Sequence, residues 1–224
     1  MTATITPTDE QIQREVLAEL EWDATVRSTE IGVAVKDGVV TLTGWVDSYA
    51  KKLAAERAAH RVRGVKAVAN EIEVRLPSSA ERTDPDIALE VIRALAWEPL
   101  VPADQIQVTV SRGAVTLRGE VDWEYERRAA ERAVRRLSGV RDVINLIKVR
   151  PRVTPSAERL TQQIQDALVR NAVTDAERIR VEVQGSKIVL RGTVRSWAEK
   201  AEAERVAWSA PGVTAVENHI TVEP

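Results

Sequence analysis

The sequence predicts an α/β protein of the α+β type, built from three tandem modules, each with a mixed three-stranded sheet and two helices on one face. A seven-residue pattern recurs at residues 40–46, 115–121 and 188–194, with a glycine at its fifth position. A Gly-Val pair and then an asparagine follow each copy at fixed offsets. The copies lie 75 and then 73 residues apart, which defines the repeating unit. The repeated residues are Gly44, Gly119 and Gly192, Gly64, Gly139 and Gly212, and Asn70, Asn145 and Asn218.

Each module begins with a predicted helix. In the second copy the tripeptide Thr-Asp-Pro at 83–85 supplies a capping side chain and a proline suited to the first turn. Ile87, Val91 and Leu95 then follow at four-residue intervals, which indicates one buried stripe. The other two copies carry apolar residues at matching places.

A β-hairpin follows the first helix. In the second copy Ile106, Val108 and Val110 alternate with polar residues, as in a half-buried strand. The turn sequence Ser-Arg-Gly at 111–113 then reverses the chain into a strand that carries the seven-residue pattern.

The second helix of each module has small residues at its inward positions, including four alanines between residues 54 and 59, so it can approach the sheet closely. A third strand then closes the unit. A right-handed crossover into that strand places both helices on one face of the sheet. The predicted domains are residues 8–77, 83–151 and 154–224.

The composition excludes several classes of protein. The chain has 224 residues, no cysteine and a formal net charge of −2, so it has neither a disulfide framework nor the basic excess of a nucleic-acid-binding protein. Residues 1–10 lack the features of a signal peptide, and no apolar run approaches the roughly 20 residues that span a bilayer. We predict a cytoplasmic protein that is not transmembrane and binds no nucleic acid, with peripheral membrane association left open.

The repeated residues resemble a known family. A hairpin ending in Gly-x-Val-Thr-Leu-x-Gly-x-Val, an alanine-rich helix and the sequence Gly-Val-x-x-Val-x-Asn-x-Ile-x-Val are together similar to the BON domain. This family is named for bacterial osmotic-stress and nodulation proteins. The resemblance covers nearly the whole chain, and it implies a binding module without catalysis that is associated with envelope integrity, osmotic stress and contact with phospholipid.

The repeated glycines and asparagines are predicted to be structural. A strand glycine often marks the close approach of another segment, here expected to be a helix on the sheet. A buried asparagine needs hydrogen-bond partners, which we expect to be backbone groups near the Gly-Val pairs. His60 and His219 are the two histidines, and neither position repeats an imidazole in another copy. We therefore predict no catalytic residue, no metal site and no cofactor, and hence a protein that is not an enzyme.

Tryptophan differs most between the copies. Trp22 and Trp97 share one repeat position at the end of the first helix, whereas Trp208 replaces a histidine and an arginine of the other copies. These rings either pack at the rim of the core or anchor a ligand, a lipid surface or a neighbouring subunit. The outer sheet faces of the first two copies are expected to be covered by another copy or another chain. The candidate ligand or interface residues are Trp22, Trp45, Trp97, Trp123, Trp197, Trp208, Ile144 and Leu146.

Three functions fit these observations. The leading one is a non-catalytic binding and scaffold protein, related to stress or the envelope, that forms a homo-oligomer or binds an amphipathic partner. The second is peripheral binding to an anionic phospholipid surface. The third is binding or transport of a small amphipathic, drug-like or osmolyte molecule in aromatic clefts between modules.

Overall fold

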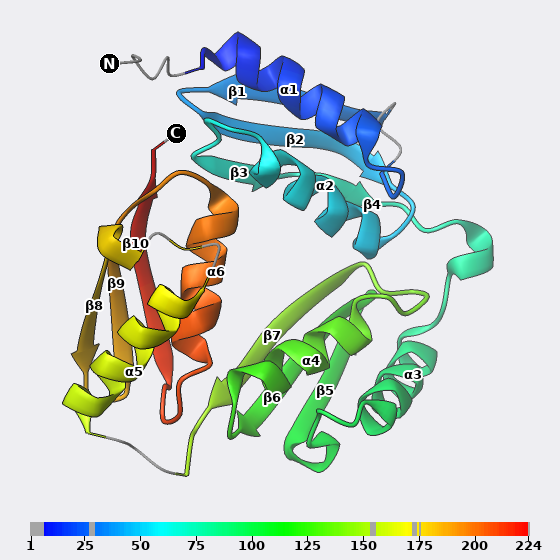
Figure 1. The fold of residues 1–224 in the computed structure, drawn as a ribbon. Helices are drawn as coiled ribbons and strands as arrows, with labels where there is room; N and C mark the ends of the chain where they lie inside the picture. The colour runs from blue at the N-terminus through cyan, green and yellow to red at the C-terminus, as the bar shows by residue number, and fades with distance from the viewer. Residues whose placement is uncertain (1–6, 27–29, 153–155, 172–173, 175, 224) are drawn as a thin grey trace.

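Three modules follow one another along the chain in the computed structural model, which describes residues 7–26, 30–152, 156–171, 174 and 176–223 (Figure 1). Each module consists of a helix, a β-hairpin, a second helix and a final strand. The hairpin strands pair antiparallel, and the final strand lies parallel to the second strand of the hairpin. The predicted α+β fold with mixed sheets is confirmed.

The elements have the following bounds. Module 1 contains α1 (Asp9–Trp22), β1 (Ile31–Lys36), β2 (Val39–Val46), α2 (Tyr49–Arg61), β3 (Ala67–Asn70) and β4 (Glu73–Val74). Module 2 contains α3 (Asp84–Trp97), β5 (Ile106–Ser111), β6 (Ala114–Val121), α4 (Glu124–Val134) and β7 (Asp142–Val149). Module 3 contains α5 (Ala157–Arg170), β8 (Ile179–Gln184), β9 (Lys187–Val194), α6 (Trp197–Trp208) and β10 (Ala215–Val222). Short 3-10 turns are η2 (Ser78–Ala80), η3 (Ala103–Gln105) and η4 (Ala176–Arg178).

Both helices of a module cover the same face of its sheet (Figure 1). The core lies between the two helices on one side and the sheet on the other. In module 1 the buried stripe of α1, formed by Ile12, Val16 and Leu20, meets Val40 and Leu42 of β2. Module 1 keeps a core of its own, whereas modules 2 and 3 share one continuous core. Modules 2 and 3 therefore depend on each other for burial, as expected of units too small to bury a large core alone.

The strand glycines have a different structural role from the predicted one. Gly119 has φ +146°, and a Cβ added to it would lie 2.1 Å from the carbonyl oxygen of Gln105, which is backbone just before β5. Gly44 and Gly192 stand in the same relation to Glu30 and Arg178. The close approach is thus made by the backbone that leads into the neighbouring strand and not by a helix.

The asparagines are also bonded differently from the prediction. The side-chain amide of Asn145 donates to the carbonyl oxygen of Arg127 and to a carboxylate oxygen of Glu131, both at 3.1 Å. Its own oxygen accepts from the backbone N–H of Ile147 at 3.2 Å. The parallel register of the last strand places the asparagine opposite the middle of the second helix, which lies away from the Gly-Val turn. Asn70 and Asn218 repeat all three bonds.

The three modules are arranged around a common centre (Figure 1), where the second helices α2 and α6 contact each other. The start of each second helix meets the next module, so that module 1 contacts module 2, module 2 contacts module 3 and module 3 returns to module 1. We call these contacts junctions 1–2, 2–3 and 3–1. A tandem repeat thereby closes into a ring in which the three junctions use equivalent positions.

Candidate binding clefts between the modules

Each junction is built from two repeat positions. One is the fifth residue after the strand glycine, which is Tyr49, Glu124 or Trp197 in the three modules. The other is the fourth residue before the Gly-Val glycine, which is His60, Arg135 or Trp208. Tyr49 joins the shared core of modules 2 and 3, Glu124 and Trp208 line one cleft, and Trp197 lies against His60. The positions are equivalent but the side chains are not, so each junction has its own chemistry.

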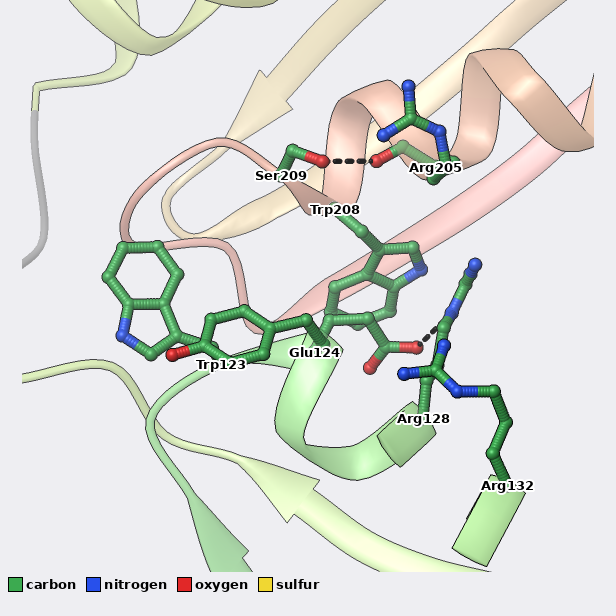
Figure 2. Close-up of a pocket in the computed structure, with 8 residues that line it drawn as sticks. Trp123, Glu124, Arg128, Arg132, Arg205, Trp208 and Ser209 are labelled. Carbon is green, nitrogen blue, oxygen red and sulfur yellow. Dashed lines mark hydrogen bonds and ion pairs between the residues drawn. The ribbon is translucent and has the colours of Figure 1, made fainter. Parts of the chain in front are cut away.

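The cleft at junction 2–3 is the first candidate site (Figure 2). It has a volume of about 490 Å³, which is within the usual range for small-molecule sites. Module 2 contributes the N-cap Trp123 and one side of α4 as far as Arg132 in its last turn, and module 3 contributes the end of α6. The lining residues are Trp123, Glu124, Tyr125, Arg128, Arg132, Arg205, Trp208 and Ser209.

Aromatic rings form one side of this cleft. Trp123 and Tyr125 stack with their ring centroids 6.2 Å apart and an interplanar angle of 24°. Trp208 reaches across from module 3 and is only 9 % exposed. The Arg127 guanidinium lies 5.2 Å from the centroid of the Trp208 ring, a cation–π contact that joins the two modules.

Charged side chains form the other side. Glu124 is 4 % exposed, and it is neutralised by Arg127, whose Nε lies 2.7 Å from one carboxylate oxygen, and by Arg128 at 3.0 Å from the other. Arg205 is bonded to Glu202, and these bonds lower the pKa of that carboxyl to about 2. Arg132 has no ion pair or side-chain hydrogen bond with any described residue. The cleft therefore offers one uncommitted guanidinium beside an aromatic wall.

Junction 3–1 is filled by a ring pair. The rings of Trp197 and His60 lie 4.5 Å apart between centroids, and the indole N–H of Trp197 donates to the carbonyl oxygen of Val65. Lys200 lies 5.0 Å from the centroid of the same indole. Burial lowers the pKa of His60 from its ordinary value of 6.5. His60 thus serves as a neutral ring at an interface, consistent with its lack of a repeated imidazole.

The remaining candidate residues lie outside these junctions. Trp22 and Trp97 are 84 % and 85 % exposed at the ends of α1 and α3. Trp45 lies on the outer sheet face of module 1, where Arg75 approaches its ring to 5.7 Å. Ile144 and Leu146 remain 44 % and 47 % exposed on β7, so no described part of this chain covers them fully. The expectation that another module of the same chain covers these two residues was therefore wrong. That another chain covers them remains a prediction.

Sequence reasoning missed the charged half of the cleft at junction 2–3. Glu124, Arg128 and Arg132 fall in a dense run of charges on α4, a pattern that usually indicates a solvated helix face. A usable signal was present in the repeat register, because Glu124 occupies the position of Tyr49 and Trp197. An acid that replaces two aromatic residues in a repeat needs a local partner, and the adjacent arginines supply it.

The described part of the chain contains neither a cluster suited to a metal ion nor a membrane-spanning helix. Among those residues, no group of three or more histidine, aspartate or glutamate side chains is placed to hold a metal ion. None of the helices there combines the length and the apolar character needed to cross a bilayer.

Comparisons with known proteins agree with the repeat. The profile of the BON domain matches three times, at residues 8–75, 83–151 and 156–224. The chain is 30 % identical over 146 residues to osmotically-inducible protein Y of Escherichia coli (strain K12). The aligned region covers 63 % of this chain and 73 % of that protein. It is 31 % identical over 127 residues to an uncharacterised protein from the gshII 5′ region of Anaplasma centrale, covering 54 % of this chain and 83 % of that one.

A solved structure of CdsD, a structural protein of the type III secretion system of Chlamydia trachomatis, is 14 % identical with a TM-score of 0.28, covering 94 % of this chain and 91 % of that one. An identity and a TM-score this low do not indicate a shared function. The three profile matches instead span most of the chain, at the same repeats that the glycines and asparagines mark. The chain belongs to the BON domain family.

Proposed function

We propose that this protein is a non-catalytic binding and scaffold protein of the osmotic-stress or envelope response, and that it binds a small amphipathic anion at junction 2–3. The observation that carries the proposal is the pairing of an aromatic wall with an uncommitted arginine in one cleft of ligand size. The relation to osmotic stress rests on family membership and on the similarity to an osmotically inducible protein.

The cleft has the features that such a ligand requires. A flat apolar ring can lie against Tyr125 and Trp123, because aromatic side chains favour offset-stacked contacts. An anionic group on the ligand can accept charge-assisted hydrogen bonds from Arg132, the arginine of the cleft that is held by no described acid. Glu124 is already neutralised by two arginines, so it does not repel the anion strongly.

An aromatic sulfonate tests the proposal, because 8-anilinonaphthalene-1-sulfonate combines a flat ring with one negative charge and becomes fluorescent when bound. Wild-type protein is expected to bind it, and Arg132→Gln is expected to weaken binding by about tenfold, or about 1.4 kcal/mol. Arg63→Gln is the matched control, since it removes the same charge from an exposed position outside the cleft. Equal affinity of both variants for the sulfonate would contradict a site at junction 2–3.

A second candidate function is peripheral binding to anionic phospholipid, and it is favoured by the two exposed tryptophans. Indole rings prefer the interface between lipid and water, and Trp22 and Trp97 present theirs almost fully to solvent. Flotation with anionic vesicles tests it, using Trp22→Ser/Trp97→Ser as the variant. Flotation of the wild type that is lost in the double variant supports this function. Absence of flotation of the wild type argues against the function, and equal flotation of both proteins argues against these two tryptophans as its anchors.

A further inference from the structure

A second cleft lies at junction 1–2, at positions equivalent to the cleft at junction 2–3. Its volume is about 460 Å³. Module 1 contributes the first part of α2, and module 2 contributes the two arginines that follow the end of α4. The residues that line it include Ser48, Lys51, Leu53, Arg57, Arg135 and Arg136.

This cleft is strongly cationic. Arg57, Arg135 and Arg136 line it, and none of these guanidinium groups has an ion pair or hydrogen bond with any described residue. Lys51 also lines it but is bonded to Asp47 at 2.6 Å. No aspartate or glutamate is found among the described residues that line the cleft. Glu131, the acid that attracts Arg135, accepts a hydrogen bond from Asn145.

The guanidinium groups oppose one another electrostatically. Burial lowers the pKa of Arg135, and the charges of Arg57 and Arg136 lower it further. A guanidinium group nevertheless remains protonated in proteins, so the like charges persist in the folded chain. The arrangement has an energetic cost that an anion between the arginines would offset.

The cluster is specific to this junction. The equivalents of Arg135 are His60 and Trp208, which are both engaged in ring contacts at the other junctions. The equivalent of Arg136 in module 1 is Arg61, which is bonded to Glu19 and Asp23. The position of Arg57 is an arginine in all three modules, as Arg132 and Arg205, so the repeat accounts for that one. It does not account for Arg135 and Arg136, whose equivalents are other residue types or, in Arg61, an arginine paired with acids.

The rest of the cleft indicates the kind of anion. Its volume exceeds that of a single inorganic ion, and Leu53 with neighbouring alanines gives it an apolar wall. The Ser48 side chain makes no capping hydrogen bond to α2, so its hydroxyl group can donate to a ligand. Three arginines match the several oxygens of a phosphate group, for which the guanidinium fork is well suited. We propose that the cleft at junction 1–2 binds a multivalent phosphate-type anion, carried either by a soluble organic phosphate or by a lipid headgroup.

Calorimetric titration of the full chain with tripolyphosphate at low ionic strength tests the proposal directly. The variant is Arg57→Gln/Arg135→Gln, and its Kd for tripolyphosphate is expected to rise by at least about tenfold. The matched control is Arg63→Gln/Arg118→Gln, which removes the same charge from exposed positions outside the cleft and should change the Kd by less than about twofold. Since the cleft variant removes a repulsion, its thermal midpoint without anion should equal or exceed that of the wild type.

Vesicles of phosphatidic acid and of phosphatidylcholine distinguish the two sources of phosphate. Tripolyphosphate binding that is lost selectively in the cleft variant supports the site with a soluble ligand. Binding to phosphatidic acid vesicles alone, lost in the same selective way, supports the site with a lipid headgroup. The proposal is overturned if neither probe binds, or if the cleft variant and the control lose affinity equally. The sulfonate test at junction 2–3 uses other residues, so the two proposals can fail separately.

Discussion

The clefts at junctions 1–2 and 2–3 use the same positions of the repeat but differ in almost every side chain. Where junction 2–3 has Trp123, Tyr125 and Trp208, junction 1–2 has Ser48, Ala50 and Arg135. One cleft presents aromatic rings and a buried acid bonded to two arginines, whereas the other presents three arginines that no described acid holds. A common frame thus supports two different surfaces, and the difference comes from a few substitutions at positions that the fold leaves free.

The two clefts also differ in what they contribute to stability. Trp208 buries a large apolar ring, and modules 2 and 3 share one core around it. Arg135 is partly buried among like charges, so junction 1–2 keeps an unfavourable interaction in the folded state. Charged groups that repel one another in the folded state are more informative about binding than residues that stabilise the core. The stability of the fold therefore explains the side chains of the cleft at junction 1–2 less well than those of the cleft at junction 2–3.

Loss of the common frame is expected to have the largest effect. In Gly119→Ala the new methyl group would lie 2.1 Å from the Gln105 carbonyl oxygen, at a backbone φ of +146°. We expect a loss of more than about 4 kcal/mol in the free energy of unfolding, measured by urea denaturation, because a backbone clash adds to the strain. Module 2 would then fail to support either cleft.

Gly185→Ala is the control for this prediction. Gly185 has φ +65° and no described atom within 4 Å of an added Cβ. The change should cost roughly 1 kcal/mol, as is usual for a residue in the left-handed region. Equal losses in the two variants would show that the close approach at Gly119 does not matter.

The second prediction compares the two clefts at one repeat position. Trp208→Ala should destabilise the protein by about 3–5 kcal/mol, since it empties a buried site between two modules. Arg135→Ala, at the equivalent position, should leave the free energy of unfolding within about 1 kcal/mol of the wild type or raise it, because a repulsion is removed. Urea denaturation followed by far-UV circular dichroism measures both.

A solvent-exposed tryptophan calibrates that comparison. Trp22→Ala should change stability by less than about 0.5 kcal/mol, since the ring is 84 % exposed. We propose that junction 2–3 stabilises the protein and that junction 1–2 contains a repulsion. This proposal would be wrong if Arg135→Ala lowered the free energy of unfolding as much as Trp208→Ala.

The fold could be predicted because its signals are local and occur three times. Helical and alternating spacings each define an element, and the repeat fixes their order. The asparagine bonds were predicted wrongly because the register between a strand and a crossover helix depends on tertiary packing. Sequence could not separate Trp22 from Trp208, which are 84 % and 9 % exposed, since their burial depends on how modules meet. For the same reason Arg57 and Arg135, far apart in the chain, gave no sign of forming one cluster.

The smallest expected effect concerns junction 3–1, which closes the ring. Unlike the other two junctions, it is expected to contribute a stability that depends on pH. Burial lowers the pKa of His60 below 6.5, and its ring lies 4.5 Å from that of Trp197. Below pH 6.5 the unfolded chain therefore binds a proton at His60 more readily than the folded chain does. The stability contributed by the neutral ring is complete above pH 6.5 and is lost as the pH falls from there through the pKa of the folded state.

Thermal midpoints measured from pH 7.5 down to pH 5 should therefore fall more steeply for the wild type than for His60→Phe, which keeps a ring against Trp197 but cannot be protonated. Each unit between the folded and unfolded pKa values corresponds to about 1.4 kcal/mol, so this effect should be smaller than the loss caused by Trp208→Ala. His219→Phe provides the control, because His219 is exposed on β10 and is paired with Glu217 of the same strand. Removal of the pH dependence by His60→Phe but not by His219→Phe would assign it to ring closure, and parallel curves for wild type and His60→Phe would exclude that assignment.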